Sequence, residues 1–236
     1  MAVNYIPEPL QPHCARAMFG VMRIQTRAYD LFKLPVISTG RPFGFYRRIF
    51  FDGRSEPQVL KELWGKRIVD VGCGLTPYLS NSMFQACEAA GIEFYGVDPK
   101  IGKDFRFGAF DRLKSRVTGG ATLDPEAPGT AERALAAFAD QLPFADGSVD
   151  LMLSSWLLTV WLQDEALLAR ILAEAYRVLK PGGELRCYPQ PHWPSYFHSE
   201  VFWQAAHRFE IRQDFKVGVL PLSSPPAYMT TLRKKS

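Results

Sequence analysis

The chain has 236 residues, of which 47% are hydrophobic and 22% are charged, close to the average of globular proteins. This composition excludes disordered, collagen-like and low-complexity chains, and at about 150 residues per domain the length favours one domain with an added segment. The longest nearly uncharged apolar run, 151–162, is shorter than the roughly 20 residues of a membrane-spanning helix. The net charge of +4 is too small to indicate a nucleic-acid partner by itself.

The cysteines and the N-terminus point to an intracellular setting. Residues 1–10 contain neither the basic nor the apolar segment of an export signal. The four cysteines, Cys14, Cys73, Cys87 and Cys187, include no CxxC pair, which is typical of reduced thiols rather than of a disulfide framework or a zinc site. We therefore expect a cytoplasmic protein with no bound metal.

Residues 1–65 predict an N-terminal appendage. Apolar residues at helical spacing indicate an amphipathic helix over about 13–33, with Arg16, Arg23 and Arg27 on its other side. A loop with Gly40, Pro42 and Gly44 is expected next. Ser55 as N-cap, with a proline in the first turn, then predicts a short helix. We expect this helical and loop segment to cap the main domain on its substrate side.

From residue 66 onward, short β-rich runs alternate with longer helical stretches, a pattern typical of parallel strands joined by helices. The predicted strands are 67–71, 93–97, 149–154 and 184–188, and the predicted helices are 77–90 and 164–179. Two further runs, 209–217 and 228–233, flank a turn rich in Pro and Ser and predict a terminal antiparallel pair. Between 100 and 141 we expect a helix, a mobile loop and a short strand.

A glycine turn follows the first predicted strand. Gly72 and Gly74 would let the backbone approach a ligand closely, because glycine has no Cβ. Thr76 as N-cap and Pro77 at the first position predict a helix whose free N–H groups suit an anion. The turn differs from the dinucleotide fingerprint GxGxxG, because Pro77 stands at the third glycine position.

Two acidic residues belong to this region. Asp98, at the end of the second predicted strand, lies 26 residues after Gly72, whereas the dinucleotide fingerprint has its acid about 20 residues on. Asp70 lies inside the first strand. A buried carboxylate is costly unless it is hydrogen-bonded, so we expect Asp70 to hold backbone amides of the loop or to reach a ligand through water.

Four motifs follow one another in a fixed order. They are VDVGCG at 69–74, YGVD at 95–98, LPF with GSVD at 142–150, and RVLKPGG at 177–183. In these motifs the chain resembles the class I S-adenosylmethionine-dependent methyltransferases, over about residues 66–188. The resemblance implies an α/β fold in 66–236, with a Rossmann-like, seven-stranded, mostly parallel sheet and an antiparallel terminal strand, next to the N-terminal helical cap. It also implies S-adenosylmethionine as cofactor and S-adenosylhomocysteine as product.

The resemblance further implies a set of cofactor-binding residues. Gly72 and Gly74 would approach the methionine part, and Asp98 would bind the two ribose hydroxyls. Phe138 stands where the family often has an acid beside the adenine; either Asp140 takes that role, or Phe138 packs on the adenine next to Ala139, or Phe138 is a core residue. The expected set is Asp70, Gly72, Cys73, Gly74, Asp98, Pro99, Ala139, Asp140, Ser154 and Trp156. Core packing is the alternative for Trp156.

Methyl transfer from a sulfonium is a direct displacement, so the protein mainly has to align the reacting atoms. An acceptor hydroxyl or ammonium must also lose a proton, and a histidine is a suitable base near neutral pH. His192, in the loop after the fifth strand, is the expected base, with Tyr196 of the same loop as the second catalytic candidate. The alternative for His192 is a solvent-exposed loop residue.

The choice of acceptor depends on the added segments. The fourth strand ends in Ser154, Ser155 and Trp156, without the Asn/Asp-Pro-Pro-Tyr motif typical of methylation at base or glutamine amino groups. Aromatic residues interleaved with arginines over 41–54 suit an anionic or aromatic small molecule, but also RNA, a lipid headgroup or a plain cap. We expect methylation of a small molecule at oxygen or nitrogen. The alternatives are methylation of RNA or protein through this segment, or a catalytically silent binding protein; no oligomeric state is predicted.

Overall fold

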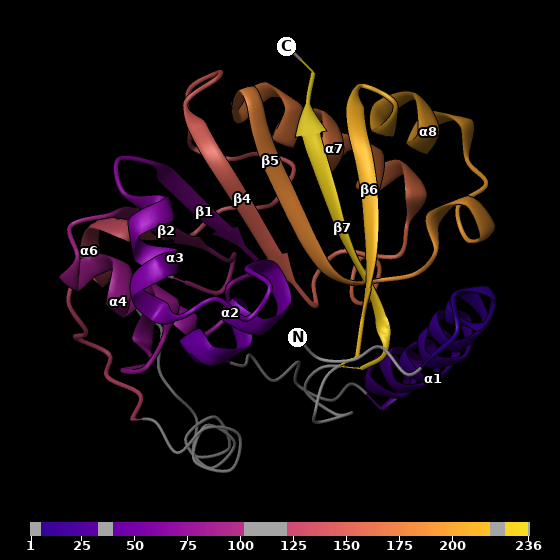
Figure 1. Cartoon of the computed structure of the whole chain (residues 1–236), viewed down its shortest axis with the longest axis horizontal. Helices are drawn as coiled ribbons and strands as arrows, with labels where there is room; N and C mark the ends of the chain where they lie inside the picture. The colour runs from indigo at the N-terminus through magenta and orange to yellow at the C-terminus, as the bar shows by residue number, and fades with distance from the viewer. Residues whose placement is uncertain (1–5, 33–39, 102–121, 218–224, 236) are drawn as a thin grey trace.

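Seven strands form one sheet in the order β3-β2-β1-β4-β5-β7-β6 (Figure 1). The structure, a computed structural model, describes residues 6–32, 40–101, 122–217 and 225–235. The strands are β1 (Arg67–Val71), β2 (Glu93–Val97), β3 (Ala134–Leu135), β4 (Val149–Ser155), β5 (Leu179–Gln190), β6 (Phe209–Lys216) and β7 (Ala227–Lys234). β3, β2, β1, β4 and β5 run parallel, and β7 is antiparallel to both of its neighbours. The predicted mostly parallel sheet with its antiparallel terminal strand is confirmed.

Both faces of the sheet are covered, which is why its central strands are almost wholly apolar. α7 (Glu165–Val178) and α8 (Glu200–Ala206) pack with one face, and α2 (Phe43–Phe50), α3 (Glu56–Leu63) and α4 (Met83–Ala89) with the other. Asp70, the one charged residue among the buried positions of β1, pairs in register with Leu153 of β4 and is fully buried. A carboxylate in the middle of this core therefore needs a specific partner.

The segment before residue 66 shares the core of the sheet. α1 (Gln11–Leu31) confirms the first predicted helix, and Gln58 accepts a hydrogen bond from the Ser55 backbone N–H at 2.9 Å at the start of α3. The prediction of a loop after residue 40 is wrong from Phe43 on, where α2 begins. Burial explains this helix: its apolar side chains at helical spacing, Phe45, Tyr46, Ile49 and Phe50, are all buried.

The chain after the glycine turn also differs from the prediction. Instead of one helix over 77–90, a single 3-10 turn, η2 (Thr76–Tyr78), is followed by α4, whose N-cap is Ser82. Thr76 is therefore not the N-cap of an α-helix, and its hydroxyl accepts the backbone N–H of Arg41 at 3.1 Å. The tertiary contact with the N-terminal segment takes the place of the local cap.

Part of the irregular region is described. α6 (Thr130–Arg133) leads directly into β3, which gives the expected helix and short strand. The expected mobile loop falls in 102–121, outside the described residues. Among the helices that the structure describes, none has the length and apolar character needed to cross a bilayer.

Candidate active site

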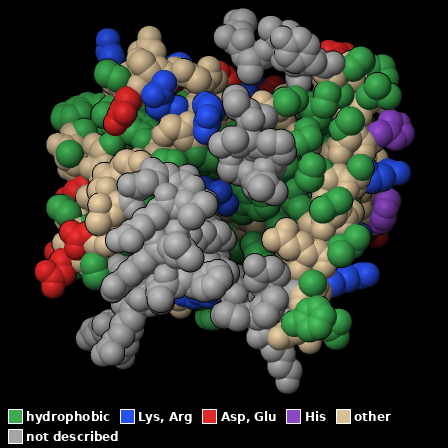
Figure 2. All heavy atoms as spheres, turned by 90° about the horizontal axis from the view of Figure 1, so that it is seen from below, with side chains coloured by type: hydrophobic (Ala, Val, Ile, Leu, Met, Phe, Trp, Pro, Cys, Tyr) green, Lys and Arg blue, Asp and Glu red, His purple; other side chains and the backbone are tan. Residues whose placement is uncertain are grey.

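The candidate site lies where the parallel strands end. The carboxyl ends of β1, β2 and β4 meet at one edge of the sheet, and α2 lies at that edge (Figure 1). Figure 2 views the molecule from this side and shows hydrophobic side chains, with Lys or Arg side chains among them, between the segments drawn in grey. Open α/β sheets bind their ligands at this edge.

The glycine turn is held against the end of β2. The backbone N–H of Gly72 donates to the Val97 carbonyl at 2.8 Å, and Gly72 and Gly74 have φ of +73° and +55°. A Cβ on Gly72 would lie 2.7 Å from Cδ2 of Leu157, so a larger residue would collide with the segment after β4. Only glycine combines this backbone conformation with this close approach.

Asp98 connects the turn to the end of β2. Its Oδ2 accepts the Gly74 backbone N–H at 3.2 Å, and its Oδ1 accepts the Lys100 backbone N–H at 2.9 Å. The side chain is partly exposed. A carboxylate has about four lone-pair sites, so Asp98 keeps acceptor capacity for two further donors. The glycine cradle and these free acceptor positions fit the ribose and methionine parts of S-adenosylmethionine.

Asp70 has its partner in the N-terminal segment. The hydroxyl of Tyr46 on α2 donates to Asp70 Oδ2, whereas the buried Oδ1 has no hydrogen-bond partner among the described residues. Burial raises the pKa of Asp70 to about 7; the Tyr46 hydrogen bond and the charge of Arg41 act in the opposite direction, and Asp98 adds to the rise. The backbone amides expected from the sequence are not its partner in the structure.

Arg41 lies beside this pair. Its guanidinium carbon is 5.0 Å from the ring centre of Phe45 and 5.3 Å from that of Trp156. Burial lowers its pKa to about 10, although the nearby Tyr46, Asp70 and Tyr188 oppose the shift. The side chain is therefore positively charged at neutral pH. The Arg/aromatic composition of this segment is visible in the sequence, but no sequence pattern marks Arg41 or Tyr46 as members of the site.

The end of β4 supplies two expected residues. The Ser154 hydroxyl donates to the Val71 carbonyl at 3.0 Å, which joins the ends of β4 and β1. Trp156 has φ of +66°, and its backbone N–H donates to the Tyr188 carbonyl at 2.7 Å. Its buried Nε1 has no partner among the described residues. The alternative of plain core packing does not explain this unpaired donor.

The residues expected near the adenine of the cofactor are more exposed than those around the glycine turn. Phe138 is 63% exposed, so the alternative that it is a core residue is wrong. Asp140 forms an ion pair with Arg170 of α7, with Oδ2 and Nε 3.3 Å apart, and Pro99 is exposed. The roles of Ala139, Asp140 and Pro99 toward the adenine stay predictions.

The two catalytic candidates lie in the loop after β5, under α1. His192 Nδ1 is 3.2 Å from Ser195 Oγ, and burial together with the charge of Arg16 lowers the His192 pKa. The Tyr196 hydroxyl is buried without a partner among the described residues, and Arg23 of α1 lies over its ring at 5.4 Å. Within the described ranges, no hydrogen bond or ion pair joins His192 or Tyr196 to Asp70. Their catalytic roles stay predictions.

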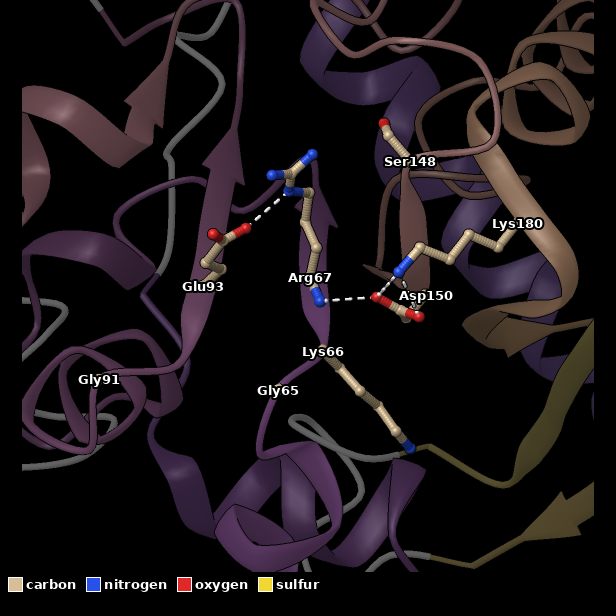
Figure 3. Close-up of a pocket in the computed structure, with 8 residues that line it drawn as sticks. All are labelled: Gly65, Lys66, Arg67, Gly91, Glu93, Ser148, Asp150 and Lys180. Carbon is tan, nitrogen blue, oxygen red and sulfur yellow. Dashed lines mark hydrogen bonds and ion pairs between the residues drawn. The ribbon is translucent and has the colours of Figure 1, made fainter.

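A hollow lies at the opposite edge of the sheet, where the strands begin (Figure 3). Lys180 Nζ is 2.7 Å from Asp150 Oδ2, and Arg67 Nε is 2.7 Å from Glu93 Oε2. The backbone N–H of Arg67 also donates to Asp150 at 2.8 Å. These charges pair with one another and hold adjacent strands together, so the hollow is not the candidate site.

The strand order and the site at the glycine turn define a nucleotide-cofactor-binding α/β protein of the methyltransferase type. A family model described as a methyltransferase domain matches residues 69–187, just over half of the chain. The chain belongs to this methyltransferase family, and S-adenosylmethionine is its cofactor. No curated protein matches the chain.

Solved structures are similar to the chain at low sequence identity. A methyltransferase from Methanosarcina mazei is 17% identical, with a TM-score of 0.44, over 75% of this chain and 97% of that one. A TehB-like methyltransferase from Corynebacterium glutamicum is 14% identical, with a TM-score of 0.45, over 94% of this chain and 100% of that one. The family assignment rests on the matched family model and on the strand order described above.

The raised pKa of the buried Asp70 carboxyl predicts how the free energy of unfolding depends on pH. Its pKa of about 7 in the folded protein exceeds the ordinary value of about 3.9. Between these values the folded state binds more protons than the unfolded state, so this group lowers the free energy of unfolding as pH rises. For Asp70→Asn, which cannot ionise, the free energy of unfolding relative to wild type is expected to increase by up to about 1.4 kcal/mol per pH unit.

Urea unfolding of both proteins at about pH 4 and about pH 7 measures this difference. Taking variant minus wild type at each pH cancels the titration of the other groups. A difference that is the same at both pH values would mean that Asp70 is ionised normally in the folded protein.

Proposed function

We propose that the chain transfers a methyl group from S-adenosylmethionine to an oxygen or nitrogen of a small molecule that binds beneath the N-terminal segment. The observation that carries this proposal is the packing of α2 over the carboxyl ends of the strands. Tyr46 reaches Asp70 in β1, and Phe45 packs against Tyr188 of β5 with ring centres 6.4 Å apart. A site covered in this way suits a compact acceptor better than a polymer.

The same packing weakens the RNA alternative. The aromatic side chains of 43–51 would have to be accessible in order to stack on bases, yet Phe43, Phe45, Tyr46, Phe50 and Phe51 are all buried. Two of the arginines also have partners within the segment: Arg47 Nε donates to the Arg54 carbonyl at 2.6 Å, and Arg54 pairs with Glu62. Arg48 and Arg54 are the exposed members of the group.

Methyl transfer is a direct displacement, so the protein itself forms no covalent bond with the substrate. The bound cofactor supplies an electrophilic methyl group on a positively charged sulfur. The glycine turn and Asp98 hold the cofactor's position, and the N-terminal segment excludes water and orients the acceptor. His192 accepts the proton that an acceptor hydroxyl or ammonium loses, and the neutral Tyr196 hydroxyl, whose pKa burial raises, donates a hydrogen bond to the acceptor.

Replacement of these two residues is expected to affect turnover and not cofactor affinity. His192→Gln should lower kcat by about a hundredfold, the size of effect typical of a lost general base. Tyr196→Phe should raise KM with a smaller change in kcat. Steady-state kinetics and S-adenosylhomocysteine titrations on each variant measure both effects. His207→Gln, at the C-terminal end of α8, is the matched control. Unchanged kcat in His192→Gln would remove it as the base.

The proposal as a whole is tested in two steps. Calorimetric titration with S-adenosylmethionine and S-adenosylhomocysteine is expected to give micromolar affinities. Transfer of a radiolabelled methyl group is then measured with panels of small hydroxyl and amine compounds, with RNA and with protein. Labelling of a small compound supports the proposal. Salt-sensitive labelling of RNA, or labelling of protein alone, would contradict the small-molecule acceptor, and cofactor binding without any transfer would favour a silent binding protein.

A further inference from the structure

Helix α1 lies at the rim of the molecule, next to β7 (Figure 1). One side of the helix is buried against the rest of the chain, through Ala15, Phe19, Met22 and Thr26. These positions repeat every three or four residues, as expected for the inward side of an amphipathic helix. The outward side of a surface helix is normally polar, and α1 departs from that rule.

Apolar side chains form a stripe along the outward side of α1. Val21, Ile24 and Leu31 are 61%, 70% and 77% exposed, and the equally exposed Leu10 and Phe32 extend the stripe beyond the two helix ends. At 3.6 residues per turn these positions share one face, roughly opposite the buried side. Single exposed apolar residues are common on protein surfaces, but a row of them along one face marks an interaction site.

Three arginines run along one flank of this apolar stripe. Arg16, Arg23 and Arg27 are all exposed, and their spacing of 7 and 4 residues places them in one row between the stripe and the buried side. Arg16 Nη2 donates to the Ser195 carbonyl at 3.0 Å, and Arg23 Nε donates to Gln163 Oε1 at 3.3 Å. Both acceptors are uncharged. None of the three arginines forms an ion pair with a carboxylate of the described residues.

The combination of charge and apolar surface selects the occupant of this face. Residues 11–28 contain no Asp or Glu, so a second copy of α1 placed on this face would bring like charges together. RNA binds through bases stacked on aromatic rings, whereas the exposed Val21, Ile24 and Leu31 are aliphatic. An anionic bilayer surface meets both requirements, because its phosphates attract the arginines and its acyl boundary accepts the apolar side chains.

We propose that α1 docks the protein on the surface of an anionic membrane. The apolar stripe enters the interfacial layer, the arginine row meets the lipid phosphates, and the helix lies in the plane of the bilayer with its buried side still packed on the protein. Phe19 packs on Tyr196 with ring centres 5.8 Å apart, so docking also brings the loop after β5 close to the bilayer. The proposal does not depend on methyl transfer, and its test needs no cofactor.

Cosedimentation of the full chain with lipid vesicles tests the proposal. Vesicles of phosphatidylcholine alone are compared with vesicles that also contain about one quarter phosphatidylglycerol, an anionic lipid. Wild type is expected to bind the anionic vesicles, to bind the neutral ones more weakly, and to be released in part as the salt concentration rises, because salt screens the arginines and not the apolar contact.

Two variants change the two parts of the face separately. Val21→Ser/Ile24→Ser removes apolar area at exposed positions and is expected to weaken binding to anionic vesicles by about tenfold or more. Arg27→Glu reverses one charge of the row and should weaken it by about fivefold or more. The matched controls are Val201→Ser, at a 57% exposed position of α8, and Lys61→Glu, at an exposed position of α3; both should bind as wild type does.

Several results would overturn the proposal. Folded wild type that binds no anionic vesicle contradicts it, and so does equal binding of wild type and both variants, because another surface would then hold the vesicle. Equal binding to neutral and anionic vesicles would remove the role of the arginines. Circular dichroism confirms that each variant keeps its helix content, so that a loss of binding is not a loss of folding.

Sedimentation velocity of the protein without vesicles tests the remaining occupant. Wild type is expected to show no self-association that depends on the apolar stripe. A dimer that Val21→Ser/Ile24→Ser converts to a monomer would mean that the stripe is an interface between copies of the chain, and the membrane proposal would be wrong.

Discussion

Replacement of Asp98 by alanine is expected to weaken S-adenosylhomocysteine binding about a hundredfold. The carboxylate already accepts the backbone N–H groups of Gly74 and Lys100, and we propose that its remaining lone pairs accept the ribose hydroxyls. Hydrogen bonds to a charged group contribute about 1.5 to 3 kcal/mol each, and 1.4 kcal/mol is a factor of ten in affinity. Calorimetric titration of the variant and wild type measures the change.

Asp98→Asn separates the shape of the side chain from its charge. It should fold like wild type and still lose affinity, because an amide offers a single acceptor oxygen where the carboxylate offers two. Asp214→Asn, on the edge strand β6, is the matched control and should bind as wild type does. Equal affinity of Asp98→Ala and wild type would place the ribose hydroxyls elsewhere.

Replacement of Gly72 by alanine is expected to abolish cofactor binding and to lower the free energy of unfolding by about 3 kcal/mol. A left-handed backbone conformation costs a residue with a Cβ about 1 to 2 kcal/mol, and overpacking adds about 1 to 3 kcal/mol. Both terms apply here, because φ is +73° and the new Cβ would lie 2.7 Å from Leu157 Cδ2. Moving Leu157 away would shift the segment that continues from Trp156.

Gly91→Ala measures the cost of the left-handed backbone conformation alone. Gly91 has a φ of +68°, but a Cβ there meets no atom within 4 Å. The variant should therefore lose only about 1 to 2 kcal/mol and bind S-adenosylhomocysteine normally. Denaturant unfolding of both variants gives the difference, which is the cost of the collision at Gly72. If the two variants were equally stable and both bound cofactor, the close approach of the turn to Leu157 would have no functional role.

The residues that contact Asp70 and Trp156 were harder to predict from the sequence than the glycine turn. The strands, the glycine turn and Asp98 follow from short segments in which the apolar pattern and the glycine spacing are local signals. The partners of Asp70 and Trp156 come from residues about 25 and 115 positions away in the chain. No local pattern relates such positions, and only the Arg/aromatic composition of 41–54 pointed toward them.

Two predictions of secondary structure were wrong for the same reason. The Gly and Pro residues of 40–44 are typical of a loop, yet burial of the aromatic side chains against β1 and β5 makes 43–50 a helix. Thr76 and Pro77 have the sequence of a helix start, yet the Thr76 hydroxyl is taken by the Arg41 backbone N–H, and α4 begins only after Ser82. In both places a long-range contact outweighs a weak local preference.

The sequence by itself determined the parallel sheet, the antiparallel terminal pair, the methyltransferase family and the glycine turn, because these depend on periodicity and on motifs within one strand and its loop. Only the tertiary structure decided which residues cover the site: Tyr46 on Asp70, and Arg41 between Phe45 and Trp156. The physical reason is that a buried charge acquires its partner through the packing of distant segments, and the cost of leaving it unpaired selects the packing that supplies one.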